Sequence, residues 1–345
     1  MKGLSLFSNI GIAETYLEDI GYEVVVANEL IQQRADLYKD FYPETEVISG
    51  DITEEKTKKK IIKESKEKGV EFIMATPPCQ GMSLAGKKDS SDKRNFLIYE
   101  IAPIFNKLKP KFLFLENVTT LLKLKSGNKR VLDIFYDMLN LKNYEVLEMS
   151  LNAKDYGTPQ SRQRCIILII NKEYKFEIPK KQKEITLEEA IGHLPTLESG
   201  ETSKIKYHNA KVHKKEHIDW LKHTPTGKSA HDNKKHYPVK PSGERIKGYK
   251  TTYKRMSWDK PAPTITMANG SVSSQNNVHP GRIKKNGQYS DARVLTLREI
   301  IILSGLPDNW EYNEYICGEE TIRKLIGEGI PPHLVEAVFR GISRA

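Results

Sequence analysis

The sequence has 345 residues, of which 38% are hydrophobic and 29% charged, which is typical of a soluble globular protein. No apolar run approaches the roughly 20 residues that a membrane-spanning helix needs, and residues 1–10 are too short and too polar for a signal peptide. The three cysteines form no closely spaced pair, which argues against a disulfide-framed secreted domain and favours a cytoplasmic protein with no membrane association.

The positive charge of the chain is concentrated in one segment. The net charge is +10. Residues 203–254 contain thirteen Lys and one Arg against four acidic residues, so this segment alone sums to +10 and the remainder is near neutral. Lysine-rich runs are commonly solvated surface. This one lies between two stretches with catalytic residue types, and we therefore favour a nucleic-acid footprint.

Strands and helices alternate over the first half of the chain. Apolar and β-branched runs predict strands at residues 4–7, 23–27, 46–49, 70–75 and 111–115. Helical spacing predicts helices at residues 12–20, 30–42, 54–68, 96–108 and 131–141. Two further strands, 144–152 and 165–170, are expected to pair antiparallel at one edge. This order predicts an α/β fold with a doubly wound, mixed but mostly parallel sheet.

The composition changes near Pro179. From there to about Arg255 the chain is polar and basic with several Gly and Pro, which predicts a separate, smaller and loop-rich lobe. Strand residues in this part are expected within 246–265. Helices are predicted at residues 294–303, 321–326 and 333–342.

A single cysteine follows the strand predicted at 70–75. Pro77 and Pro78 end that strand, because proline cannot donate a ladder hydrogen bond, and Cys79 comes next. Ligands bind at the carboxyl edge of open α/β sheets, so Cys79 is a candidate nucleophile as the thiolate. A lone cysteine is otherwise most often small, buried and inert.

Three charged residues are candidates to act beside this cysteine. Glu116 ends the strand predicted at 111–115. Arg162 and Arg164 would share one face of a strand, where two guanidinium groups suit a phosphate or a carbonyl, and Arg164 is placed to orient Glu116. Taken alone, Glu116 is equally a helix cap or ion-pair partner. The alternative for the two arginines, which we favour less, is an ion-paired edge strand.

Together these stretches resemble the cytosine-carbon-5 DNA methyltransferase family. Residues 74–83 resemble its Pro-Cys motif, Glu116-Asn117-Val118 its Glu-Asn-Val motif, and residues 160–164 its Gln-x-Arg-x-Arg motif. Residues 255–265 resemble the motif that packs the recognition lobe, and residues 327–332 resemble the final Gly-Asn-x-Val-Pro-Pro motif. The motifs occur in the family's order and span Leu4 to Leu334.

The resemblance implies an S-adenosylmethionine-dependent methyltransferase fold with a second, smaller DNA-recognition lobe. The thiolate of Cys79 would add to carbon 6 of a flipped-out cytosine, whose ring nitrogen and amine Glu116 would contact. We expect a catalytic and cofactor-binding domain at 1–178, a recognition lobe at 179–290, a hinge region at 291–317 and a C-terminal return to the catalytic domain at 318–345.

Three successive strand ends carry candidate residues for the methyl donor. Glu29 would accept from ribose hydroxyls, Asp51 from an adenine amine, and Ile52 would pack on the ring. The first turn supplies the remaining candidates, which are Phe7, Asn9, Ile10 and Gly11. The absence of a GxGxxG pattern argues against NAD, whose pyrophosphate uses it.

The sequence departs from the family pattern at four positions. Asn9 and Ile12 replace glycines of the first turn, Leu30 stands where an aromatic residue is common, and Glu328 replaces Asn. These departures leave open the path of the turn and the packing against adenine.

No metal site is expected from the sequence. His213 and His217 have helical spacing, but neither a cysteine nor an acidic pair completes a ligand set around them.

The expected partners are duplex DNA and, functionally, a restriction endonuclease, with the enzyme acting as a monomer. The single recognition region resembles prokaryotic modification enzymes of restriction systems. Two alternatives remain open at this point: a transfer-RNA cytosine-5 methyltransferase on the same scaffold, and a non-catalytic DNA-binding regulator. The DNA sequence that is recognised does not follow from residue spacing.

Overall fold

The computed structural model describes residues 1–78 and 93–345, and the side chains of all of these except 93–95. The chain divides into two compact units. The first unit contains Met1–Asn152, Gln163–Lys180 and Leu334–Ala345, and the second contains Ala153–Arg162 and Lys181–His333. The domain bounds expected from the sequence, which change at residues 179, 291 and 318, stay predictions.

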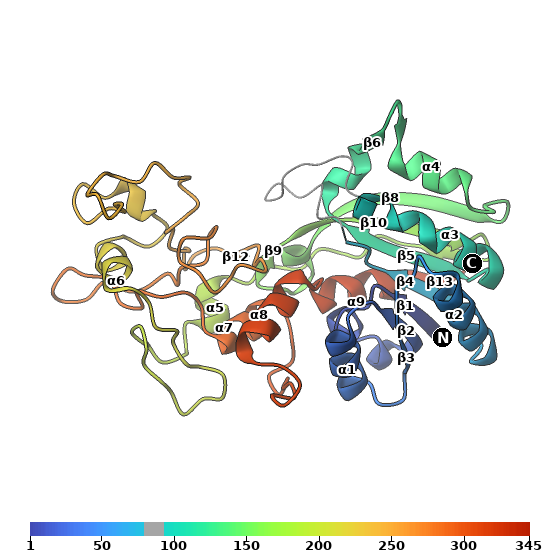
Figure 1. Ribbon diagram of the computed structural model, residues 1–345, viewed down its shortest axis with the longest axis horizontal. Coiled ribbons are helices and arrows are strands. Elements are labelled where there is room, and N and C mark those ends of the chain that lie inside the picture. The colour runs from blue at the N-terminus through green and yellow to red at the C-terminus, as the bar shows by residue number, and fades with distance from the viewer. Residues whose placement is uncertain (79–92) are drawn as a thin grey trace. The chain divides into compact units, whose positions relative to one another are not determined.

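The first unit is built on a seven-stranded sheet with the order β3-β2-β1-β4-β5-β10-β8 (Figure 1). Its strands are β1 (Lys2–Leu6), β2 (Glu23–Glu29), β3 (Glu46–Ser49), β4 (Phe72–Ala75), β5 (Phe112–Asn117), β8 (Tyr144–Asn152) and β10 (Gln163–Asn171). The five strands from β3 to β5 are parallel, whereas β10 runs antiparallel to both β5 and β8. The structure therefore confirms the mostly parallel sheet with an antiparallel edge.

Helices cover both faces of this sheet. They are α1 (Gln32–Phe41), α2 (Glu55–Glu67), α3 (Ile101–Leu108), α4 (Val131–Asp137) and α9 (Pro332–Arg340). One face packs its aliphatic residues with those of α2, α3 and α4 in a single core. On the other face Phe72 and Phe112 stack at 5.2 Å, and Phe339 of α9 meets both rings edge-on. Short strands β6 (Lys125–Ser126), β7 (Lys129–Arg130), β11 (Tyr174–Phe176) and β13 (Ile342–Arg344) complete the unit.

Two predicted helices have a different form. The stretch 12–20 forms two 3-10 helices, Ile12–Glu14 and Glu18–Ile20, whose amides bond to carbonyls three residues back. Gly11 and Gly21 bound this stretch with φ of 80° and 82°. The helix predicted at 96–108 is a 3-10 helix over Lys93–Glu100 followed by α3. A further 3-10 helix spans Thr119–Lys123.

The second unit has little regular structure in the residues described. It contains β9 (Gln160–Ser161), β12 (Ala262–Pro263), α5 (Leu187–Ile191), α6 (Lys215–Lys222), α7 (Leu297–Leu303), α8 (Glu319–Glu328) and 3-10 turns at Ala153–Tyr156 and Ala230–Asp232. The strand residues expected within 246–265 yield only β12 and isolated bridges. One buried hydrophobic cluster of this unit includes Trp220, Tyr253 and Val278.

A fully buried arginine holds the loops of the second unit together. Arg255 donates to the backbone carbonyls of Leu221, His279 and Asp291 at 2.8–3.3 Å. These side-chain hydrogen bonds do for the loops what backbone hydrogen bonds between strands do in a sheet. They give buried carbonyl groups the donors that they need. The part of the chain that the structure describes contains no helix long and apolar enough to cross a membrane.

Candidate active site

The chain leading to Cys79 is tied to two strands. Thr76, after β4, donates from its amide to Leu6 O and from its hydroxyl to Phe7 O. Asn117, at the end of β5, donates from Nδ2 to Pro77 O at 2.9 Å. The approach to the predicted nucleophile is thus fixed at the carboxyl edge of the sheet. Cys79 itself lies outside the described residues.

Glu116 and Arg164 form an ion pair beside that edge. Arg164 Nε donates to Glu116 Oε1 at 2.8 Å, and the two side chains are only 13% and 11% exposed. The pairing follows from the sheet register, because Ile166 of β10 lies opposite Glu116 of β5 and Arg164 is two residues away on the same face. The pairing expected from the sequence is present, and it fixes the orientation of the Glu116 carboxyl.

The two cysteines described in the structure are poor nucleophiles. Cys165 and Cys317 are free and buried. Burial raises the pKa of the Cys165 thiol to about 12, with the Glu116 carboxylate as a second cause, and burial also raises the pKa of Cys317. Both remain protonated at neutral pH, so neither competes with Cys79 for the role of nucleophile.

Arg162 does not share a strand with Arg164, and this part of the sequence interpretation is wrong. The strand is interrupted at Arg162, which belongs to the second unit. Its guanidinium is buried and donates to three backbone carbonyls, those of Ile265, Gly327 and Glu328, at 2.8–3.0 Å. Arg162 therefore binds the protein's own backbone rather than presenting a free cation.

The first turn and Glu29 form one hydrogen-bonded unit. Glu29, at the end of β2, accepts from the amides of Asn9 and Ile31, one on each carboxylate oxygen. The side chain is 6% exposed, and burial raises its pKa. A carboxylate has about four acceptor positions, so Glu29 retains capacity to accept from hydroxyl groups. Ser8 Oγ in the same turn is buried without a hydrogen-bond partner among the described residues.

The first turn follows a left-handed path despite its missing glycines. Phe7, Asn9 and Gly11 have φ of 58°, 51° and 80°. A Cβ atom on Gly11 would lie 2.2 Å from the Tyr42 ring, and the Tyr42 hydroxyl donates to Gly11 O at 2.6 Å. Asparagine tolerates the left-handed region better than most residues, which explains how Asn9 replaces a glycine here.

The remaining cofactor candidates differ in exposure. Asp51, after β3, accepts from the amide and hydroxyl of Thr53 through Oδ1 at 2.8 Å. Ile10 and Ile52 are 1% and 4% exposed and belong to the buried interior. Leu30, directly after Glu29, is 61% exposed and offers apolar surface at this edge.

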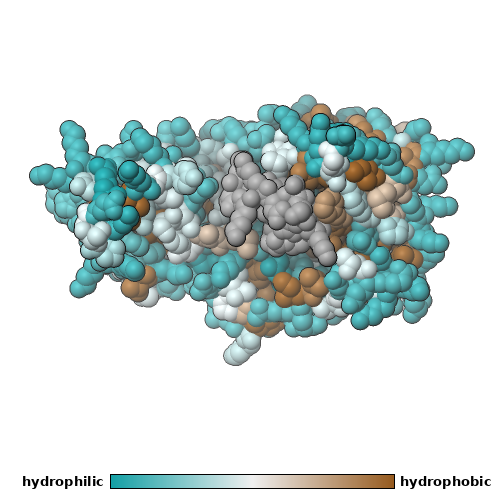
Figure 2. All heavy atoms as spheres, turned by 45° about the horizontal axis from the view of Figure 1, so that its top comes forward, coloured by the Kyte–Doolittle hydropathy of each residue, from teal (hydrophilic) through white to brown (hydrophobic). Residues whose placement is uncertain are grey.

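The basic segment lies in the second unit and is largely exposed. Lys234, Lys235 and Lys247 are exposed and make no ion pair with a described carboxylate. In Figure 2 hydrophilic residues cover most of the face shown, and hydrophobic residues gather in small patches. Unpaired lysines on such a surface suit the phosphates of a nucleic acid.

Comparisons with known proteins identify the family. A sequence model of the family described as C-5 cytosine-specific DNA methylase matches residues 1–344. The chain is 46% identical to a protein of Avibacterium volantium named Type II methyltransferase M1.HgaI, covering 99% of this chain and 98% of that one. It is 28% identical to Type II methyltransferase M1.HphI of Haemophilus parahaemolyticus, over 98% of this chain and 86% of that one.

Solved structures show the same fold at low sequence identity. A putative DNA modification methyltransferase encoded within an E. coli prophage has a TM-score of 0.72 and 18% identity, over 99% of this chain and 98% of that one. Spodoptera frugiperda DNMT2, in mutant form, has a TM-score of 0.66 and 18% identity, each chain covered over 98%. The fold is thus that of methyltransferases. The chain belongs to the C-5 cytosine-specific DNA methylase family and is a DNA (cytosine-5-)-methyltransferase.

Three features of the structure were missed in the sequence. The first is the hydrogen bond from Asn117 to Pro77 O. Its only signal in the sequence is that an asparagine follows Glu116. The buried carboxyl of Glu14 lies in a stretch with helical spacing, which gives no sign of its burial. Asp219 and His223 have helical spacing, but their approach to His236 depends on the fold of a loop.

Proposed function

We propose that this chain transfers a methyl group from S-adenosylmethionine to carbon 5 of a cytosine flipped out of duplex DNA, through a covalent bond to Cys79. We further propose that it protects DNA from a partner restriction endonuclease, as the names of its type II relatives suggest. The buried ion pair of Glu116 with Arg164, next to the chain that enters Cys79, is the observation that carries the proposal.

The first three strand ends fit the methyl donor. Glu29 retains acceptor capacity for ribose hydroxyls, and Ser8 Oγ is a buried polar atom without a partner among the described residues. Asp51 has a second carboxylate oxygen for an amine, and Leu30 offers apolar surface for the adenine ring. When bound, S-adenosylmethionine supplies the electrophilic methyl group that carbon 5 of cytosine accepts.

The residues of the chain account for the remaining steps. The Cys79 thiolate forms a bond to carbon 6, and the ring electrons move to carbon 5, which becomes the nucleophile toward the methyl group. Glu116 hydrogen-bonds the ring nitrogen and exocyclic amine and is held in orientation by Arg164. Loss of the carbon-5 proton to a base then breaks the sulfur–carbon bond and restores the thiolate.

The target base must leave the duplex before Cys79 can reach carbon 6. Unstacking and unpairing cost a few kcal/mol, which contacts elsewhere on the DNA must offset. We assign these contacts to the exposed lysines of residues 203–254, within the recognition lobe that we propose at residues 179–290.

A trapping experiment tests this function. Duplexes with 5-fluorocytosine in varied sequence contexts are incubated with the protein and S-adenosylmethionine. Fluorine does not leave as a proton does, so the covalent adduct accumulates and is mapped by mass spectrometry. We expect the adduct on Cys79, its loss in Cys79→Ser, and its retention in Cys317→Ala, a matched control at a buried free cysteine.

Other outcomes distinguish the alternatives. An adduct that forms on transfer RNA and on no duplex would replace the DNA proposal with the RNA one. Failure to trap either nucleic acid, with the methyl donor still bound, would overturn the covalent mechanism. An adduct on a different cysteine would overturn the assignment of Cys79.

A further inference from the structure

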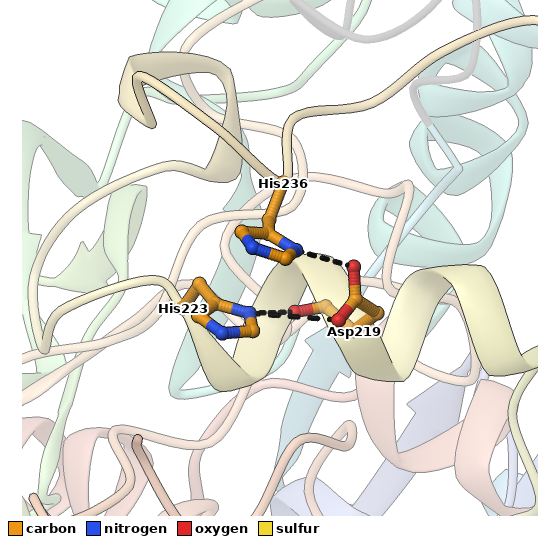
Figure 3. A group of neighbouring side chains, drawn as sticks. All are labelled: Asp219, His223 and His236. Carbon is orange, nitrogen blue, oxygen red and sulfur yellow. Dashed lines mark hydrogen bonds and ion pairs between the residues drawn. The ribbon is translucent and has the colours of Figure 1, made fainter. Parts of the chain in front are cut away.

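Three potential metal ligands converge at one end of helix α6. Asp219 lies on the helix. His223 is one turn further along and directly follows the last helical residue, and His236 comes from the loop after Ala230–Asp232 (Figure 3). One ligand atom from each residue lies within 4.8 Å of the other two. In the part of the chain that the structure describes, no other group of three His, Cys, Asp or Glu residues meets this criterion.

Both imidazole rings face the same carboxylate. His236 Nδ1 is 2.7 Å from Asp219 Oδ2. His223 Nδ1 donates to the backbone carbonyl of Asp219 at 2.8 Å and lies 3.6 Å from Asp219 Oδ1. The rings are stacked, with centroids 3.6 Å apart and planes inclined by 12°, so both Nδ1 atoms lie on the side of Asp219 (Figure 3). The side chains are 30–50% exposed, so an ion has access and the rings have room to rotate toward it.

The loop that carries His236 is held in place by bonds that do not involve the three ligands' side chains. Asn233 donates through Nδ2 to Trp220 O, Thr224 Oγ1 and His236 O at 3.0–3.2 Å. His236 has a left-handed backbone with φ of 56°. These contacts bring His236 over the end of α6 before any ion binds, which lowers the ordering cost of forming a site.

The two histidines considered in the sequence analysis are occupied differently. His213 Nε2 accepts from the amide of Val294 at 3.2 Å, and the ring of His217 packs on Trp220 and Tyr253. The cluster of potential ligands therefore lies further along the chain, around the end of α6, than His213 and His217, the pair noted in the sequence.

We propose that Asp219, His223 and His236 bind one divalent transition-metal ion of the zinc class, which fastens the loop 230–237 to helix α6. Two neutral imidazoles and one carboxylate are a common zinc ligand set, and water fills the fourth position of a tetrahedral site. His223 Nδ1 donates to the Asp219 carbonyl in this structure, so binding through Nδ1 requires the tautomer with the ring proton on Nε2. Rotation of the two rings about their Cβ–Cγ bonds then turns both Nδ1 lone pairs toward one ion at the usual Zn–N distance of about 2.0–2.1 Å. The role is structural, because none of the three residues belongs to the catalytic machinery.

The test measures Zn²⁺ binding to the full-length protein without a histidine tag. A Cys79→Ser background removes the candidate reactive thiolate, and chelation followed by dialysis removes adventitious metal. Calorimetric titration with Zn²⁺ is expected to give one site per chain. His223→Ala and His236→Ala are each expected to raise the Kd at least about 100-fold, since loss of an outer-sphere partner alone costs 10–100-fold. His193→Ala, at an exposed histidine outside the cluster, is the matched control.

A second measurement uses the unaltered cluster, so the test does not depend on how the variants fold. In ¹⁵N-histidine spectra, Zn²⁺ is expected to shift the Nδ1 resonances of His223 and His236 and leave His193 unchanged. Hydrogen exchange of residues 230–237 is expected to slow on Zn²⁺ addition. Absence of a one-to-one site, or binding that survives both His223→Ala and His236→Ala, would overturn the proposal.

Discussion

Glu14 is a carboxyl group buried in the first unit, three residues beyond Gly11. Its Oε1 accepts from Ser5 Oγ at 2.6 Å and lies 3.4 Å from the Tyr38 hydroxyl, whereas Oε2 has no hydrogen-bond partner among the described residues. Burial raises the pKa of Glu14 from 4.5 to about 7. The carboxyl is thus protonated in the folded protein over a range in which an exposed glutamate is ionised.

This shift predicts how Glu14 contributes to pH-dependent stability. Between about pH 4.5 and 7 the folded state keeps a proton that the unfolded state has lost, so stability falls as pH rises through this window and levels off above it. Each difference of one in pKa corresponds to about 1.4 kcal/mol, so the shift from 4.5 to about 7 limits the fall in stability to about 3.5 kcal/mol. Glu14→Gln, which stays neutral, is expected to remove it.

Urea unfolding at pH 5, 6, 7 and 8 measures this contribution. Glu18→Gln, at an exposed glutamate nearby, serves as the control and should keep the wild-type pH dependence. Parallel stability curves for the wild type and Glu14→Gln would show that Glu14 is ionised in the folded state.

Asn117 positions the chain that enters Cys79. Its Nδ2 donates to Pro77 O, and its Oδ1 accepts from the amide of Val118. Asn117→Ala is expected to slow single-turnover methyl transfer about 10- to 100-fold, because small displacements of a reacting group have effects of this size. Binding of the methyl donor should change little. Asn140→Ala, at an exposed asparagine, is the control, and an unaltered rate in Asn117→Ala would contradict the positioning role.

Residues differ in how far the sequence predicts their partners. Glu116 and Arg164 lie on neighbouring antiparallel strands, so the register brings them together once β10 lies beside β5. The predicted strands alone do not contain that neighbour relation, because they pair 165–170 only with 144–152. The partners of Arg162 are carbonyls of residues 265, 327 and 328, more than 100 positions away. The sequence motif identifies Arg162, but it does not predict which distant backbone carbonyls bind its side chain.

At the scale of elements, Arg162 fastens β9 to two distant parts of the second unit. Strand β9 pairs with β12, and Arg162 binds the carbonyl of Ile265 beyond β12 and those of Gly327 and Glu328 at the end of α8. Lysine has one donor group where arginine has a planar fork, so Arg162→Lys leaves buried carbonyls without partners.

Arg162→Lys is therefore expected to destabilise the second unit by at least about 2 kcal/mol, since each unsatisfied buried group costs about 1–3 kcal/mol. Hydrogen exchange resolved by peptide measures the change, and residues 160–163, 262–266 and 325–329 should lose protection together. Arg340→Lys, at an exposed side chain, is the matched control. If the loss of protection were confined to residues 160–163, the fastening role would be wrong.

The elements that the sequence predicts least well are those without local periodicity. Residues 12–20 have helical spacing, but the chain closes three-residue hydrogen bonds between two left-handed glycines. In the second unit, a buried arginine and a buried ion-pair cluster around Arg293 replace the strands expected within 246–265. Arg255 donates to carbonyls 24 to 36 positions away, and Arg293 donates to the carbonyl of Leu197, 96 positions away. A local pattern does not contain contacts of this separation.

At the scale of the whole molecule, the two units differ in what they contribute. The sheet of the first unit collects the predicted donor-binding strand ends and the Glu116–Arg164 pair, and the C-terminal α9 packs on one face of that sheet. The second unit contains the segment 203–254, whose charge of +10 equals that of the chain. This division predicts that substitutions in the second unit change the affinity for DNA, whereas substitutions in the first unit change the rate of methyl transfer.

The salt dependence of DNA binding tests this division. Each phosphate contact by a cation contributes about −0.9 to the slope of log K against log salt concentration on duplex DNA. Replacing Lys234, Lys235 and Lys247 by Gln is expected to reduce the slope by up to about 2.7 and to weaken binding without a change in far-UV circular dichroism. Fluorescence anisotropy at several salt concentrations measures both quantities.

The control removes the same charge from the first unit. Lys56, Lys59 and Lys66 are exposed on α2, and their replacement by Gln lowers the net charge from +10 to +7, as the other triple variant does. A long-range effect of net charge would act equally on both variants, whereas direct phosphate contacts reduce the slope only for the second-unit lysines. Equal slopes for the two variants would therefore show that Lys234, Lys235 and Lys247 do not contact phosphates.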